Sequence, residues 1–151
     1  LKFNYDNHLI LRLGWLYGGN VNHKKNFVHK ILREAIQKEV IYSDDDILGS
    51  PTSTFDVSKQ LNLLIEKNIT GIFNCVNTSD YPISRLEYVR HILNTLKLKN
   101  IIKPAPNNHF KRLANIPKNE SALNLNLNKQ KFNIMNNWDL SLSKYIIDNY
   151  E

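Results

Sequence analysis

The chain has 151 residues, of which 42% are hydrophobic and 23% charged, and its formal net charge is +6. This length and composition fit one compact unit, or part of a larger one, with enough apolar surface for a core. The basic residues are scattered and lack the aromatic interleaving of a single-strand binder, which argues against nucleic acid as a partner. An anionic small molecule would suit the charge equally well.

Membrane and export signals are absent from the sequence. No apolar run reaches the roughly 18 to 20 residues needed to cross a bilayer. The single cysteine, Cys75, cannot form an internal disulfide, so we expect a buried thiol in a cytoplasmic protein. The first residues do not resemble a secretory signal and there is no initiator Met, so we expect a segment of a longer protein.

The first third of the chain alternates strand and helix signals. Residues 9–11 form a short apolar run followed by Gly14 and Gly18, which predicts a buried strand leading into a loop. Residues 27–39 place apolar side chains at the spacing of an amphipathic helix. Residues 40–42 then predict a brief strand.

The middle third continues this alternation. Residues 43–52 have loop chemistry, and a second helix is predicted from about residue 56 to residue 67. Residues 71–76 predict another strand. Ser84 lies three residues before Glu87, so the hydroxyl and the carboxylate can cap the start of a third helix reciprocally.

The last third is less regular. Residues 100–103 predict a strand, and residues 104–121 form a long polar segment without a period. Residues 124–127 alternate like a strand, but they equally fit a turn that enters a helix near Asn128. A last amphipathic helix is predicted over residues 139–150.

The alternation of strands and helices predicts a single α/β unit over residues 1–151. The sequence shows no group of residues typical of a catalytic centre. The five histidines have no partners at zinc spacing, and the adjacent carboxylates of Asp44, Asp45 and Asp46 repel one another and indicate a solvated turn. The sequence contains no Gly-x-Ser-x-Gly elbow, no phosphate loop and no Gly-x-Gly-x-x-Gly turn. We therefore predict no metal site and no complete catalytic centre in this chain.

Several short motifs, taken in order, resemble the C-terminal half of the dTDP-4-dehydrorhamnose reductase family, which belongs to the extended short-chain dehydrogenase/reductase group. They are RLGWLYG at 12–18, NFV at 26–28, DILGSPT at 46–52, GIFN at 71–74 and SRLEY at 84–88. Further on, Pro117, Asn119, Ser121, Ala122 and Leu123 resemble the family's Arg-Pro-x-Asn-Ser-x-Leu segment. The resemblance covers nearly the whole chain and implies the α/β substrate-binding part of an NAD(P)-binding, Rossmann-like enzyme.

The resemblance also shows what this chain lacks. The family's Gly-rich cofactor turn and its Tyr-x-x-x-Lys pair would precede Arg12, so the N-terminal nucleotide-binding half is missing. The implied cofactor is NADP or NAD in the intact protein, and we expect the segment alone to bind neither and to be inactive. Its implied partners are a nucleotide-diphosphate sugar and the missing half. Ile116 stands where the family usually has arginine, which removes a bidentate contact to a diphosphate.

The resemblance places five residues at the substrate. Trp15 would form a flat wall against the sugar ring or pack in the core, and Tyr17 has the same two interpretations. Asn26 could donate to a diphosphate or cap the helix that follows it. The Thr52 hydroxyl could reach the ligand or cap the next helix. Arg85 suits a phosphate, with a solvated helix face as the competing interpretation.

The functional prediction is a sugar-nucleotide-binding segment of an NAD(P)-dependent reductase of 4-keto nucleotide-diphosphate sugars. A segment of a sugar-nucleotide epimerase or dehydratase would share the same sheet. A non-catalytic binding or regulatory subunit on the same scaffold is a further alternative.

Overall fold

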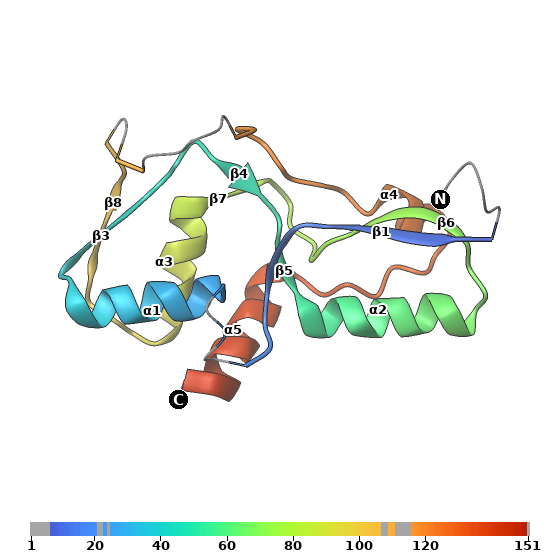
Figure 1. Cartoon of the computed structure of the whole chain (residues 1–151), viewed down its shortest axis with the longest axis horizontal. Coiled ribbons are helices and arrows are strands. Elements are labelled where there is room, and N and C mark those ends of the chain that lie inside the picture. The colour runs from blue at the N-terminus through green and yellow to red at the C-terminus, as the bar shows by residue number, and fades with distance from the viewer. Residues whose placement is uncertain (1–6, 21–22, 24, 107–108, 111–115, 151) are drawn as a thin grey trace.

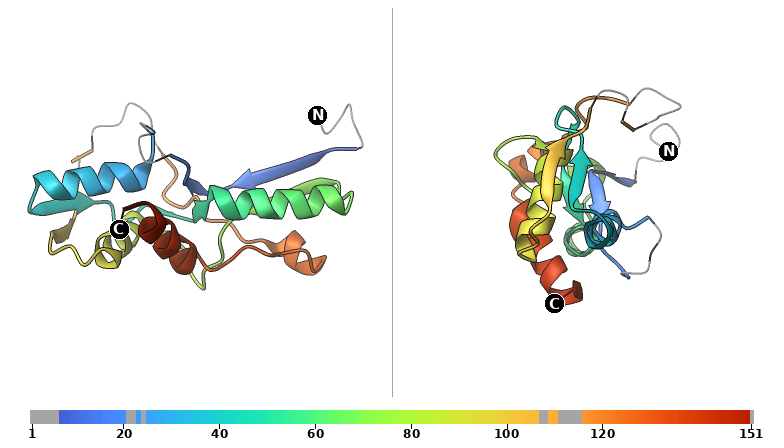
Figure 2. Two further views of the ribbon diagram at one scale, coloured as in Figure 1. Left: turned by 90° about the horizontal axis from the view of Figure 1, so that it is seen from below. Right: turned by 90° about the vertical axis from the view of Figure 1, so that its left-hand side faces the viewer.

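The structure is a computed structural model that describes residues 7–20, 23, 25–106, 109–110 and 116–150. The helices are α1 (Phe27–Gln37), α2 (Thr54–Glu66), α3 (Arg85–Thr95), α4 (Leu125–Lys129) and α5 (Trp138–Tyr150). The strands are β1 (Leu9–Leu13), β2 (Trp15–Tyr17), β3 (Val40–Ser43), β4 (Leu48–Gly49), β5 (Pro51–Ser53), β6 (Gly71–Cys75), β7 (Ile83–Ser84) and β8 (Ile101–Pro104). The chain is elongated, with α1, α3, β3 and β8 at one end and α2, α4, β1 and β6 at the other (Figure 1, Figure 2).

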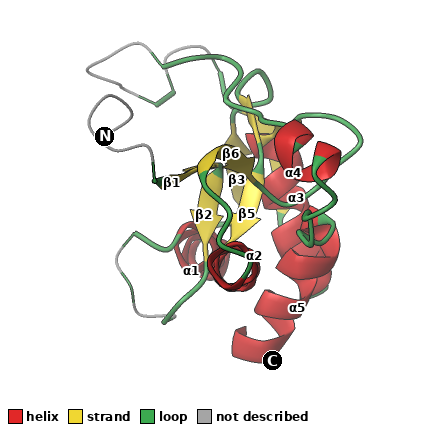
Figure 3. Ribbon diagram, turned by 90° about the vertical axis from the view of Figure 1, so that its right-hand side faces the viewer, coloured by secondary structure: helices red, strands yellow, loops and turns green. Residues whose placement is uncertain are grey.

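Parallel pairing dominates the strand contacts. β1 pairs with β6, β2 with β5 and β3 with β8, all in parallel, whereas β4 and β7 form a short antiparallel pair. Parallel neighbours need crossover connections, and the intervening helices supply them. Seen along the long axis, the strands lie between α1 and α2 on one side and α3, α4 and α5 on the other (Figure 3). The predicted α/β class is confirmed.

Two hydrophobic clusters, one at each end, hold these layers together. The first joins α1, β3, α3 and α5 around Tyr88, and the second joins α2, β6 and α4 around Phe73. Cys75 belongs to the second cluster and is buried, as predicted. Its sulfur lies 3.6 Å from the thioether sulfur of Met135.

The cap predicted for the third helix is confirmed. The Ser84 hydroxyl accepts from the Glu87 amide at 3.1 Å, and the Glu87 carboxylate accepts from the Ser84 amide at 2.8 Å. This reciprocal pair satisfies two amides that a helix start otherwise leaves unpaired.

The second helix begins two residues earlier than predicted. Ser53 is its N-cap, and the Ser53 hydroxyl accepts from the Asp56 amide at 3.4 Å. The alternative in which Thr52 caps this helix is therefore wrong, because Thr52 lies inside β5.

The first strand is less buried than its apolar sequence predicts. Leu9 and Leu11 are half-buried, Leu13 is 42% exposed, and Arg12 is exposed. Among the described residues β1 is hydrogen-bonded to β6 alone, so its other edge has no neighbouring strand. A sheet edge without a neighbour leaves its side chains partly open to solvent.

The C-terminal part settles one open alternative. Residues 124–127 do not form a strand, because α4 begins at Leu125 and buries Leu127 completely. Asparagine favours turns and helix ends over strands, which accounts for the outcome.

Of the long polar segment 104–121, residues 107–108 and 111–115 lie outside the described residues. No helix in the described part of the chain has the length and apolar character needed to span a membrane.

Candidate functional site

Trp15 and Tyr17, two of the predicted site residues, lie on β2. β2 lies close to the segment before β5, and a Cβ at Gly14 would lie 2.2 Å from the Ser50 carbonyl oxygen. Glycine at this position therefore permits the approach that lets the Trp15 amide donate to that oxygen at 2.8 Å. The pairing directs Trp15 and Tyr17 toward Tyr88 of α3, with ring centroids 6.5 and 6.2 Å from the Tyr88 ring.

Trp15 is half-buried and contacts three different segments. The guanidinium carbon of Arg85 lies 3.5 Å from the centroid of its ring. Its indole N–H donates to a carboxylate oxygen of Glu120 at 2.8 Å. A Cβ at Gly49 would lie 2.2 Å from the indole Cε2, so the backbone of β4 packs directly against the ring. Arg85 therefore covers ring surface that we expected the sugar to contact.

Tyr17 lies deeper than Trp15 and is 2% exposed. Its ring contacts those of Tyr88 and Tyr145 in a cluster between β2, α3 and α5. Burial, followed by the neighbouring Tyr88, raises the pKa of Tyr17 well above its ordinary range. Tyr17 is therefore a neutral phenol at physiological pH, and its position favours the core interpretation.

The Arg85 pocket lies beside the Trp15 contacts and has a volume of about 480 Å³. Its lining side chains come from α1, β3, the segment between β3 and β4, α3 and the segment after β8: Phe27, Lys30, Ile31, Glu34, Tyr42, Ser43, Asp44, Ile47, Arg85, Phe110, Ile116 and Glu120. This volume falls within the usual range of roughly 300 to 1,000 Å³ for small-molecule sites. Arg85 and Glu120 thus line the pocket directly. Both contact the Trp15 indole, which is not itself a lining residue.

The charges in the Arg85 pocket are mixed. Lys30 and Arg85 are positive, and three carboxylates also line the space: Glu34, Asp44 and Glu120. Glu34 forms an ion pair with Lys38 at 2.7 Å, and Glu120 accepts the indole hydrogen bond. Glu34 and Glu120 are therefore already engaged with other side chains of the described chain.

Asn26 and Thr52 lie away from the Arg85 pocket. The Asn26 side-chain oxygen accepts from the His29 amide at 3.2 Å and caps α1, while its amide donates to the Tyr145 hydroxyl at 2.6 Å. The Thr52 hydroxyl is fully buried and donates to the Ser50 carbonyl oxygen at 2.8 Å. Of the five predicted residues, the structure brings Trp15 and Arg85 into direct contact and uses the polar groups of Asn26 and Thr52 within the fold.

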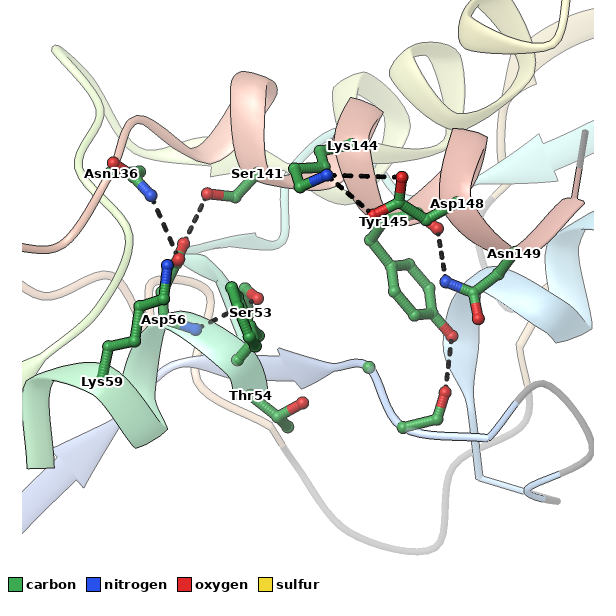
Figure 4. A pocket seen from close by; sticks show the side chains of 13 residues that line it. Ser53, Thr54, Asp56, Lys59, Asn136, Ser141, Lys144, Tyr145, Asp148 and Asn149 are labelled. Atoms are coloured by element: carbon green, nitrogen blue, oxygen red, sulfur yellow. Dashed lines mark hydrogen bonds and ion pairs between the residues drawn. The ribbon is translucent and has the colours of Figure 1, made fainter. Parts of the chain in front are cut away.

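A second pocket of about 320 Å³ lies between the start of α2 and α5 (Figure 4). Its polar groups are largely engaged with one another. Lys144 forms an ion pair with Asp148 at 3.0 Å, and the Asn149 amide donates to the Tyr145 carbonyl oxygen at 2.8 Å.

Asp56 is the central residue of this second pocket and is 5% exposed. Its carboxylate accepts from the Asn77 amide at 2.6 Å, from the Asn136 amide at 3.1 Å and from the Ser141 hydroxyl. Three donors satisfy the hydrogen-bonding capacity of this buried carboxylate, which thereby joins α2, α5 and the loop after β6. The second pocket is therefore explained by structural hydrogen bonding, and the Arg85 pocket is the candidate site.

The contact of Glu120 with Trp15 was not predicted from the sequence. Glu120 lies in the polar segment 104–121, which shows no periodicity, and 105 positions separate it from Trp15. Only the resemblance pointed to this segment as part of the site. No group of three or more potential metal ligands occurs within the described ranges.

These features define an α/β unit with a pocket of small-molecule size at the start of α3. Residues 1–151 match the family described as RmlD substrate binding domain, and the chain belongs to that family. The predicted resemblance to the dTDP-4-dehydrorhamnose reductase family is thereby confirmed.

Individual relatives agree with this assignment. The chain is 30% identical over 148 residues to a dTDP-4-dehydrorhamnose reductase from Aggregatibacter actinomycetemcomitans, which covers 89% of the chain and 48% of that relative. The crystal structure of a dTDP-4-dehydrorhamnose reductase from Bacillus anthracis in complex with NADP is similar at a TM-score of 0.85 and 27% identity, covering 97% of this chain and 50% of that one. The enzyme of the same name from Yersinia enterocolitica gives 0.83 and 28%, covering 92% and 48%. The chain thus spans less than half the length of the curated relatives it matches.

Proposed function

We propose that this chain is the substrate-binding part of an NAD(P)-dependent reductase of 4-keto nucleotide-diphosphate sugars, and that its Arg85 pocket binds the nucleotide diphosphate. The observation that carries this proposal is the guanidinium of Arg85, held 3.5 Å from the Trp15 ring centroid and 5.0 Å from that of Phe27, at the wall of a 480 Å³ pocket. Membership of the family supports the substrate class.

The chemistry of the lining fits such a ligand. A guanidinium offers several N–H donors in a planar fork, which matches the oxygens of a phosphate group. The aromatic side chains of Phe27, Tyr42 and Phe110 give the pocket flat apolar surface suited to a nucleobase. Ile116 lines the same pocket with an apolar side chain, so Arg85 is the only arginine among its described lining residues.

The role of this chain in the reaction is to bind and orient the substrate. Its sequence contains neither a Gly-x-Gly-x-x-Gly turn nor a Tyr-x-x-x-Lys pair, so the groups that hold the cofactor and donate the proton would belong to another part of the protein. A bound NADPH would supply the hydride that reduces the keto carbon.

Titration with dTDP, followed by isothermal calorimetry, tests the binding proposal. Arg85→Ala should weaken binding at least about tenfold, because it removes a charged donor from a phosphate. Arg90→Ala is the matched control, since Arg90 is an exposed arginine on the same helix and does not line the pocket. Absence of dTDP binding by the unsubstituted chain, or equal losses in the two variants, would refute the proposal.

Turnover measurements test the proposed reaction. The chain alone should not oxidise NADPH in the presence of a 4-keto dTDP sugar, whereas the complete protein should consume one NADPH for each sugar reduced. An epimerase would convert the sugar without net NADPH oxidation, and a non-catalytic subunit would do neither. Either of these results with the complete protein would overturn the reductase proposal.

A further inference from the structure

We propose that Glu120 is a positioning residue that holds the Arg85 guanidinium in its binding orientation through the indole of Trp15. This inference rests on the proposed function and adds a residue for which the sequence motifs gave no role. The inference also changes the role of Trp15. We expected its indole to contact the sugar ring, whereas here the indole supports the Arg85 guanidinium.

The contacts form a chain of three side chains. The Glu120 carboxylate accepts the indole N–H of Trp15 at 2.8 Å, which fixes the rotation of the indole about its side-chain bonds. Arg85 then rests on the ring, with its guanidinium carbon 3.5 Å from the centroid. A cation over an indole is attracted by the ring's quadrupole, and the attraction depends on how squarely the cation faces the ring. A displaced indole therefore displaces the guanidinium.

The backbone around residues 44–50 fixes the main-chain positions of Trp15, Arg85 and Glu120. The Arg85 amide donates to the Ile47 carbonyl oxygen at 3.0 Å, and the Trp15 amide donates to that of Ser50 at 2.8 Å. The Glu120 amide donates to the Leu48 carbonyl oxygen, also at 2.8 Å. One short segment thus anchors the main chain of all three residues, so their side chains meet reproducibly.

The direction in which a Glu120 substitution changes dTDP affinity shows whether Glu120 positions Arg85 or acts on the ligand only through its charge. Glu120 lines the same pocket as Arg85, and a carboxylate near a phosphate repels it. If Glu120 acted only through its charge, its removal would strengthen dTDP binding. If Glu120 positions Arg85 through Trp15, its removal should weaken dTDP binding in spite of the lost repulsion.

The test is a double-mutant cycle in dTDP affinity, measured by calorimetry. We expect Glu120→Ala to weaken binding about tenfold, and Glu120→Gln to weaken it only about threefold because an amide oxygen can still accept from the indole. In a Trp15→Phe background, which has no indole N–H, Glu120→Ala should cause no further weakening. Asp45→Ala removes an equal charge from an exposed position outside the pocket and should leave the affinity unchanged.

Fluorescence gives a second readout that a general loss of stability would not reproduce. The chain has two tryptophans, so Trp138→Phe leaves Trp15 as the single reporter. In that background Glu120→Ala should change the Trp15 emission and increase its quenching by acrylamide in the free protein, while the circular dichroism spectrum stays the same.

The outcomes separate this inference from the proposed function. Failure of the unsubstituted chain to bind dTDP would overturn both. Binding by the unsubstituted chain, together with equal or tighter binding by Glu120→Ala, would overturn the positioning role alone. Equal weakening by Glu120→Ala with and without the indole N–H would also overturn it, because the effect would not pass through Trp15.

Discussion

The guanidinium of Arg85 lies over the ring of Trp15, with 3.5 Å between the guanidinium carbon and the ring centroid. Arg85 is the first residue of α3 and Trp15 the first residue of β2, so this contact joins two elements that are far apart in the sequence. The position of the guanidinium in the pocket therefore depends on the position of the indole, and a change that moves the ring should affect ligand binding.

Gly49→Ala should produce such a displacement. The new Cβ would lie 2.2 Å from the indole Cε2, and neither the ring nor the β4 backbone can avoid it without a shift. We expect the free energy of unfolding to fall by about 1 to 3 kcal/mol and the affinity for dTDP to fall with it. Urea unfolding and calorimetry measure the two effects. Trp15→Ala in the same chain should reduce the stability cost of Gly49→Ala, and an undiminished cost would show that the clash lies elsewhere.

Asp56→Ala should be among the most destabilising substitutions in the chain. It would leave the donors of Asn77, Asn136 and Ser141 without their shared acceptor in a buried site. We expect a loss of about 3 kcal/mol or more, measured by urea unfolding. The exposed Asp45→Ala provides the control and should stay within about 0.5 kcal/mol of the unsubstituted chain. Similar results for the two variants would contradict a structural role for the Asp56 network.

His91 should make stability depend on pH. Burial between α3 and α5 lowers its pKa from the ordinary 6.5, although the nearby Asp139 acts in the opposite direction. The unfolded chain therefore binds the proton more readily than the folded chain. The contribution of neutral His91 to the free energy of unfolding is fully present above pH 6.5, and it is lost as the pH falls below that value.

A comparison of His91→Gln with the unsubstituted chain isolates this contribution. Urea unfolding at about pH 7.5 and about pH 5.5 should show a smaller loss of stability on acidification for the variant. His23→Gln alters an exposed histidine and should retain the original dependence. A loss on acidification that is the same in all three proteins would disprove the prediction.

Cys75 should resist thiol reagents in the folded chain. Burial raises the pKa of its thiol to about 11. Only roughly 0.1% of the group is then thiolate at pH 8, and the thiolate is the reactive form. Native protein should react with a disulfide reagent far more slowly than protein in urea, followed by absorbance. Equally fast labelling of both would mean that the thiol is accessible in the folded state.

Local sequence patterns determined much of the secondary structure. The capping box of Ser84 and Glu87 predicted the start of α3, and apolar periodicity predicted α1 and α5. These elements depend on residues three or four positions apart, whose interactions exist before any long-range contact forms. The order of strands and helices likewise indicated the α/β class, and the spaced motifs indicated the family.

Tertiary structure alone decided how the candidate site is assembled. The short strands β2, β4, β5 and β7 have two or three residues each and exist because distant segments pair with them. The sequence singled out Trp15 and Arg85 separately, but neither pattern showed that the guanidinium would rest on the indole or that Glu120 would hold it. Such contacts depend on the packing of segments up to 105 positions apart, which no local periodicity encodes.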